Sequence, residues 1–200
     1  VTFKEDVGIE SRGSYFDNAG IIRDVMQNHL MQVLALVAME PPVTLSAEDI
    51  RDEKVKVLRA IPPISAKDVV VGQYDGYLAE KDVRPDSVMP TYAAAKLFIN
   101  NARWEGVPFV LKCGKGLNER KAEVRIQFRN GLTFLFPSAV PNELVIRIQP
   151  SESVYLKVMT KLPGISVPTD IAQAELDLSF RDRFHRAVPE AYSYLLRDVL

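Results

Sequence analysis

The chain has 200 residues, 47% of them hydrophobic, which is enough for one domain with a sizeable core or for a large piece of a bigger protein. Its 25 Lys and Arg residues nearly balance its 26 Asp and Glu residues, and the net charge of −1 excludes a global field that would recruit nucleic acid or an anionic membrane. The single cysteine, Cys113, excludes an internal disulfide and a cysteine-based metal centre and fits a reducing compartment.

Residues 2–6 at the start of the chain alternate in the manner of a short strand, without Met, signal peptide or targeting pattern. This start is typical of the middle of a larger protein, so it gives no information about targeting. A turn-rich passage with three glycines follows over residues 8–20. No apolar run in the chain reaches the roughly 18 residues of a membrane span, and we expect a soluble protein in which any phosphate site is local.

Residues 20–39 predict a long amphipathic helix that ends at Pro41-Pro42. Apolar residues at three- and four-residue steps mark its buried stripe, which consists of Ile22, Val25, Met26, Leu30, Val33, Leu34 and Val37. His29 falls inside this stripe, three residues after Met26 and four after Val25. A core histidine and a general base both remain open, because histidine titrates near neutral pH and its surroundings tune it.

A second helix is predicted after Ser46, which is placed as the N-cap with Asp49 three residues on, and it closes at Pro62-Pro63. The apolar period then changes from 3.6 to 2, which predicts strands. The predicted strands are residues 68–74, 92–99, 108–113, 122–128, 143–149, 153–161 and 175–180. From Pro189 onward we expect a last helix that packs on the sheet through Tyr192, Leu195, Leu196 and Val199.

The short, turn-like connections between these strands favour antiparallel pairing over parallel crossovers. The expected fold is therefore α+β, a large mainly antiparallel sheet with helices packed on one face. We expect residues 1–200 to form a single domain.

The first candidate group is Glu5, Asp24 and His29. Five residues of an ideal α-helix turn about 500°, which would leave Asp24 and His29 roughly 140° apart. Asp24 is therefore a poor candidate for orienting His29. It could cap the helix or accept hydrogen bonds from a ligand over the helix N-terminus.

The second candidate group is the glycine turn of residues 113–117 and the basic residues after it. Arg offers a planar fork and Lys a compact charge, so together with the turn they suit a phosphate. The basic residues are Lys115, Arg120, Lys121 and Arg125. A solvated charged turn, with Glu119 and Glu123 as partners, explains the same pattern, which is not a P-loop.

The third candidate group is a cationic sheet face. Arg125 and Arg147 alternate with apolar residues, so they protrude on the polar face of their strands. With Tyr155 nearby, this face could hold a nucleotide through phosphate pairing and ring stacking. An interface of cross-strand ion pairs is the alternative. The group consists of Lys112, Lys121, Arg125, Arg147, Tyr155, Lys157, Asp177 and Ser179.

The run YFDNAGIIRDVMQNHLMQ at 15–32 resembles the helix that carries the catalytic histidine of glucose-6-phosphate dehydrogenases. Further similar blocks keep the family's order over nearly the whole chain. They are FKE at 3–5, RDEKVKVL at 51–58, RWEGVPF at 103–109, CGKGLNERKAEVR at 113–125, NELVIRIQP at 142–150 and ELDLSF at 175–180.

This resemblance implies the substrate and dimerisation domain of an NADP-dependent enzyme of the pentose phosphate pathway. Such an enzyme oxidises glucose 6-phosphate to 6-phosphogluconolactone. His29 would take the proton of the sugar's C1 hydroxyl as general base. The residues expected to bind the sugar phosphate are Glu5, Asp24, Lys115, Arg120 and Gln149.

The third group matches positions that bind a second, structural NADP in animal-type members of the family. Lys112 departs from the Arg often found there. The RIDHYLGKE-type motif, which supplies the carboxylate behind the histidine, does not occur in these 200 residues. Nor does a GxGxxG-type fingerprint, so we expect the hydride-accepting coenzyme site in an N-terminal domain that this stretch lacks. The stretch alone would be inactive.

The expected partners are glucose 6-phosphate, NADP and a second copy of the chain, in a cytoplasmic homodimer or homotetramer formed through the sheet. Two other functions remain open. One is a non-catalytic fragment that binds a structural NADP and mediates oligomerisation. The other is an oligomerisation piece without nucleotide, in which the alternating cations are an ion-paired interface.

Overall fold

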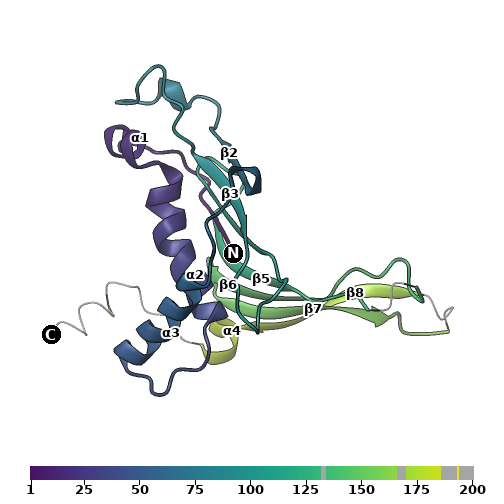
Figure 1. Ribbon diagram of the computed structural model, residues 1–200. Coiled ribbons are helices and arrows are strands. Elements are labelled where there is room, and N and C mark those ends of the chain that lie inside the picture. Colours follow the sequence, from purple (N-terminus) through teal and green to yellow (C-terminus); the bar gives the residue numbers. More distant parts are fainter. Residues whose placement is uncertain (132–133, 166–169, 186–192, 194–200) are drawn as a thin grey trace. The chain divides into compact units, whose positions relative to one another are not determined.

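The computed structural model describes residues 1–131, 134–165, 170–185 and 193, and Figure 1 shows its helices and strands. Its strands form an eight-stranded, mostly antiparallel sheet accompanied by a few helices, which confirms the predicted α+β class. Two compact units divide the chain, residues 1–122 and the residues from Glu123 onward. No helix among the described residues is long and apolar enough to cross a membrane.

Four strands of the first unit are hydrogen-bonded in the order β2-β3-β4-β1. Their bounds are β1 (Thr2–Lys4), β2 (Val69–Gly72), β3 (Tyr92–Leu97) and β4 (Phe109–Gly114). The pairs β2–β3 and β3–β4 are antiparallel, whereas β1 runs parallel to β4 with Lys4 opposite Gly114. The residues that follow these two strands, Glu5 and Lys115, therefore lie at the same end of the strand pair.

The helical part of the first unit consists of α1 (Gly13–Ile21), the π-helical segment η1 (Ile22–Leu30), α2 (Met31–Ala38) and α3 (Ala47–Arg59). Two short 3₁₀ turns, η2 (Ala66–Asp68) and η3 (Tyr77–Ala79), lie in the connections. The predicted Ser46 cap is confirmed, because the Asp49 amide donates to Ser46 Oγ at 3.2 Å. The predicted long helix is also present, from Ile21 to Ala38.

Gly20 kinks α1 one residue before its end, with φ 69° and ψ 164°, a conformation that is essentially restricted to glycine. A Cβ at this position would also collide with the Met89 side chain. Gly20 is therefore required both for the backbone angle and for the close approach of Met89.

The prediction of an α-helix throughout was wrong for residues 22–30, because η1 is π-helical and each N–H bonds five residues back. In this wider turn Leu30, five residues after Val25 and four after Met26, lies with them on the buried side of the helix and is 1% exposed. His29 is exposed, so it does not lie on the buried stripe in which the spacing placed it, and the core-histidine alternative does not hold. The sequence period of three and four could not reveal this change of turn width.

The core of the first unit lies between the helical run and the strands, where η1 packs on β4 and β1. Leu30 and Leu34 pack in one cluster with Leu97 and Leu111, and all four are at most 3% exposed. Each such side chain stabilises the fold by about 1.5–3 kcal/mol. This packing holds η1 against the end of β1.

The second unit contains β6 (Glu143–Gln149), β7 (Ser153–Lys161), β8 (Ile171–Ser179) and α4 (Phe180–Phe184), and β5 (Lys121–Gln127) begins at the unit boundary. Strands 143–149 and 153–161 have the predicted ends. Strand β8 starts four residues before the predicted 175, because residues 171–174 pair with the end of β7. Helix α4 was not predicted, and the helix expected from Pro189 lies outside the described residues.

Candidate functional site

Glu5 and Lys115 form an ion pair between the ends of β1 and β4. The Lys115 side chain is 3% exposed, and its Nζ lies 5.7 Å from the centroid of the Phe16 ring. Backbone hydrogen bonds from Glu5 N to Gly114 O and from Lys115 N to Thr91 O, both 2.9 Å, fix the two residues from either side. A buried ammonium held by one carboxylate and one ring can also bind an anionic group.

His29 lies beside β1, where its ring stacks on Phe3 with a centroid distance of 6.2 Å and an interplanar angle of 14°. Phe3 and Glu5 are two residues apart in an extended segment, so they lie on the same side of it. The imidazole and the Glu5–Lys115 pair therefore lie along one side of the start of the chain. An exposed imidazole next to a charged pair can exchange a proton with a bound hydroxyl.

Asp24 lies in the first turn of η1 and accepts a hydrogen bond from the Tyr15 hydroxyl at 2.9 Å. This bond, together with the charge of the carboxylate, raises the pKa of Tyr15. Because Asp24 precedes His29 by five residues, the π turn places it one turn away on the same side of the helix. The expected separation of 140° therefore does not apply.

The second unit contains a cationic cluster around Tyr155. The Arg147 guanidinium carbon lies 5.6 Å and Lys157 Nζ 5.8 Å from the Tyr155 ring centroid, and Arg147 Nη2 donates to the Tyr155 hydroxyl at 3.4 Å. Asp177 is directly opposite Tyr155 in the register of β7 and β8. Arg147 Nε is buried and has no hydrogen-bond partner among the described residues.

Cross-strand ion pairs also occur on this face of the second unit. Lys157 pairs across strands with Glu175 at 3.1 Å, and Arg125 with Glu143 at 2.9 Å. Arg125 also pairs with Glu123 of its own strand at 3.1 Å. The face therefore combines the features of an ion-paired sheet with a cation–aromatic cluster that suits a phosphorylated, ring-bearing ligand.

Known proteins match the chain over its whole length. The family described as "Glucose-6-phosphate dehydrogenase, C-terminal domain" matches residues 1–200. The chain belongs to this family. Glucose-6-phosphate 1-dehydrogenase of Dictyostelium discoideum is 57% identical over 209 residues, which cover 99% of the chain and 42% of that protein. The chain thus spans about two fifths of the length of this relative.

A solved structure titled "Glucose-6-phosphate dehydrogenase in complex with its substrate glucose-6-phosphate" superposes with a TM-score of 0.90 at 50% identity, covering all of the chain and 43% of that structure. Two Arabidopsis thaliana relatives differ in the compartment that their names give. The cytoplasmic one is 54% identical over 100% of the chain and 39% of its own length. The chloroplastic one is 51% identical over 99% of the chain and 36% of its own length. Both compartments therefore occur among relatives of this member of the glucose-6-phosphate dehydrogenase C-terminal domain family.

In this family member, the first unit contains five of the six residues predicted to bind the sugar phosphate or to act as base: Glu5, Asp24, His29, Lys115 and Arg120. Arg120 is exposed just before β5. Gln149 ends β6 and belongs to the second unit. The alternative interpretation of the basic turn, a charged turn with Glu119 as a partner, is also supported. Lys4 and Lys121 both pair with Glu119 at 3.0 Å.

The predicted nucleotide group is divided in the same way. Lys112 is exposed in β4, and Lys121 opens β5 within the first unit. The other six residues belong to the second unit, where Ser179 pairs with Ser153 and Asp177 with Tyr155.

The buried anchor at Asp17 was not predicted from the sequence. Its carboxylate is 3% exposed and accepts hydrogen bonds from Tyr77 Oη at 3.0 Å, from Arg84 Nε at 2.7 Å and from Ser87 Oγ. Burial alone would raise the pKa of Asp17, but these hydrogen bonds outweigh it and lower the pKa to about 2. The donors follow 60 to 70 residues later, so no local pattern indicates them.

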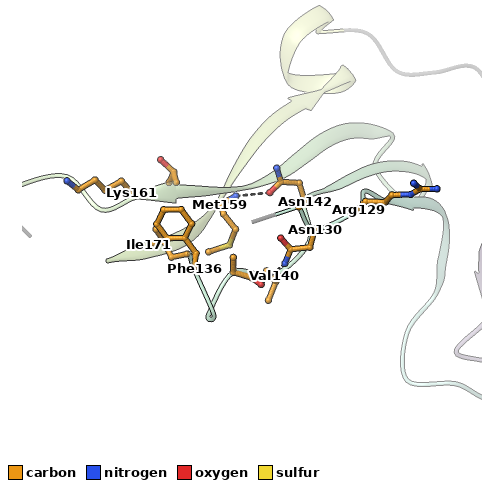
Figure 2. A pocket seen from close by; sticks show the side chains of 11 residues that line it. Arg129, Asn130, Phe136, Val140, Asn142, Met159, Lys161 and Ile171 are labelled. Carbon is orange, nitrogen blue, oxygen red and sulfur yellow. Dashed lines mark hydrogen bonds between the residues drawn. The ribbon is translucent and has the colours of Figure 1, made fainter. Parts of the chain in front are cut away.

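The structure also has a cavity of about 390 Å³ in the second unit (Figure 2). Its apolar lining includes Phe136, Val140, Met159 and Ile171. None of the predicted site residues lines it. Among the residues that the structure describes, no group of three or more His, Cys, Asp or Glu side chains could hold a metal ion.

Proposed function

We propose that this chain is the substrate-binding and oligomerisation part of a glucose-6-phosphate dehydrogenase. The enzyme oxidises glucose 6-phosphate to 6-phosphogluconolactone and transfers the hydride to NADP. The observation that carries the proposal is the meeting of His29, Phe3 and the Glu5–Lys115 pair along β1, in a chain of this family.

His29 acts as the general base. It accepts the proton of the C1 hydroxyl as the hydride leaves C1, so the alcohol carbon becomes the lactone carbonyl. Its exposure supports this role, because an imidazole stacked on Phe3 but open to solvent can contact a ligand.

The remaining residues of the group bind and orient the sugar phosphate. Lys115 and Arg120 pair with the phosphate, because both carry positive charge at the turn after β4. Glu5 and Asp24 accept hydrogen bonds from sugar hydroxyls. Gln149, which matches a sugar-binding position of the family, would contribute an amide. A ligand anion at Lys115 would share the ammonium with Glu5.

NADP would accept the hydride. We propose that the site for this coenzyme lies in an N-terminal domain outside these 200 residues. A second NADP fits the face of the second unit. The fit rests on the Tyr155 ring between Arg147 and Lys157 and on the buried, unpartnered Nε of Arg147 among the described residues. Arg147 and Lys157 would hold a phosphate, while Tyr155 would stack on a ring of the ligand.

The proposed assembly is a cytoplasmic homodimer or homotetramer formed through the sheet. Support comes from the face of the second unit opposite Tyr155, where alternate residues of the strands are apolar. Leu176 and Leu178 on this face are 63% and 41% exposed. Apolar side chains of this kind on one sheet face are typical of a protein interface.

The test is the substitution His29→Ala in the full-length enzyme. Turnover should fall by at least about a hundredfold, because general-base catalysis contributes about 10²–10⁴-fold. The dissociation constant of glucose 6-phosphate should change little. His185→Ala, which removes the other histidine of the chain, is the matched control and should leave turnover intact. Full turnover in His29→Ala would overturn the proposed base.

A second candidate function is a non-catalytic module that binds NADP and mediates assembly. The cation–aromatic cluster around Tyr155 favours it, because that cluster lies within one unit and involves neither His29 nor Lys115. Binding of NADP by the native protein without any production of NADPH would support this function over the dehydrogenase.

A further inference from the structure

The π-helical conformation of η1 changes which residues can act together. Met31 N, at its end, bonds to Met26 O, five residues back. The same spacing separates Asp24 from His29. Both side chains are therefore on one side of the helix, although an α-helix would point them about 140° apart.

A hydrogen bond from a residue outside η1 fixes the Asp24 carboxylate. The Tyr15 hydroxyl donates to Asp24 Oδ1 at 2.9 Å from α1, nine residues earlier. Among the described residues, no hydrogen bond to Asp24 Oδ2 accompanies it. One carboxylate oxygen is thus fixed by the protein, and the other remains available to a ligand hydroxyl.

The two residues that follow Tyr15 in α1 are buried and fix its position. The next residue, Phe16, is 1% exposed and lies under the Lys115 ammonium. The one after, Asp17, is buried and bonded to three side chains of the segment 77–87. Tyr15 itself is 56% exposed, so its ring contributes little to the core. The position of its hydroxyl is set by its neighbours.

We propose that Tyr15 is a positioning residue for the sugar: its hydroxyl fixes Asp24 Oδ1 and thereby directs Oδ2 to the side of η1 that carries His29. Asp24 then accepts a hydrogen bond from a hydroxyl of the same ligand whose C1 hydroxyl contacts His29. This role rests on the proposed dehydrogenase function. It adds a residue that touches no substrate atom but decides how one binding carboxylate is presented.

The test is Tyr15→Phe in the full-length enzyme. Its KM and its dissociation constant for glucose 6-phosphate, the latter measured by calorimetry, should both rise about tenfold, since a hydrogen bond to a charged group is lost. The turnover number and the KM for NADP should change by less than about twofold. Loss of a merely structural contact would instead lower the melting temperature and affect both substrates.

The matched control is Tyr74→Phe. Its hydroxyl also donates to a carboxylate oxygen, Glu80 Oε1, at 2.9 Å, but Glu80 is not one of the residues proposed to bind the sugar. It should leave the KM for glucose 6-phosphate unchanged. A double-mutant cycle completes the test: in an Asp24→Asn background, Tyr15→Phe should weaken sugar binding by less than about twofold.

The outcomes separate this inference from the proposed function. Unchanged sugar affinity in Tyr15→Phe, or an equal loss with Asp24→Asn already present, overturns the positioning role. If His29→Ala is inactive at the same time, the dehydrogenase function stands without it. Full activity of His29→Ala overturns the base itself, whatever Tyr15→Phe does.

Discussion

Asp17 shows how one buried carboxylate can fix the start of the helical run. Three donors from the segment 77–87 satisfy it, and Arg84 brings a compensating charge at 2.7 Å. Removing one partner of such a group leaves the others buried and unpaired, which costs more than the bond itself contributes. The two residues before Asp17 contact Asp24 and Lys115, so this anchor stabilises the platform of the proposed site.

The stability contribution of Asp17 should depend on pH. Its folded-state pKa, lowered to about 2 by the hydrogen bonds that outweigh burial, lies below the ordinary value of about 3.9. The ionised carboxylate therefore stabilises the fold by about 2 kcal/mol above pH 4, and this stabilisation is lost as the pH falls towards 2. Urea unfolding of Asp17→Asn at pH 7 and pH 3 should show a smaller deficit at pH 3.

Asp52→Asn is the matched control for this measurement, because Asp52 is exposed on α3. It should change the free energy of unfolding by less than about 0.5 kcal/mol at both pH values. A deficit of Asp17→Asn that is equal at both pH values would contradict the titration.

At the scale of elements, the sequence predicted what depends on local alternation. Strands 143–149 and 153–161 have the predicted ends because every second residue of each is apolar, Leu144, Ile146 and Ile148 in one and Val154, Leu156 and Val158 in the other. The π turn was not predictable, since Val25, Met26 and Leu30 fit the apolar pattern of either helix type. The Glu5–Lys115 pair was not predictable as a contact, because it depends on the parallel register of β1 and β4.

The junction between α1 and η1 depends on Gly20. Gly20→Ala should destabilise the protein by about 2–4 kcal/mol, because it adds a collision with Met89 to the backbone strain of about 1–3 kcal/mol. Gly106→Ala is the matched control: its φ is 72° and its Cβ would meet nothing within 4 Å, so only strain remains. Denaturant unfolding of both variants measures the difference.

Truncating the Met89 side chain tests whether its contact with a Cβ at position 20 contributes to the loss of stability. Combining Gly20→Ala with Met89→Ala should recover part of the loss relative to the sum of the two single variants. Strict additivity of the two substitutions would show that the contact with Met89 does not contribute.

At the scale of the whole molecule, the two proposed ligand sites draw mainly on different units. The residues around His29 belong to the first unit, and the cluster around Tyr155 belongs to the second. Each cluster depends on contacts inside its own unit, such as the Glu5–Lys115 pair or the Lys157–Glu175 pair. A substitution in one cluster should therefore leave the other ligand's affinity largely intact.

Arg147→Ala tests this separation in the full-length enzyme. A saturating ligand at 100 times its dissociation constant stabilises a protein by about 2.7 kcal/mol. NADP should therefore raise the melting temperature of the His29→Ala variant as much as that of the unchanged enzyme. In Arg147→Ala only the part of the shift that comes from the second NADP site should disappear, because the hydride-accepting site still binds NADP. Arg51→Ala, on the exposed surface of α3, should retain the full shift. If Arg147→Ala keeps the shift but loses self-association, the cationic face is an assembly interface and not a nucleotide site.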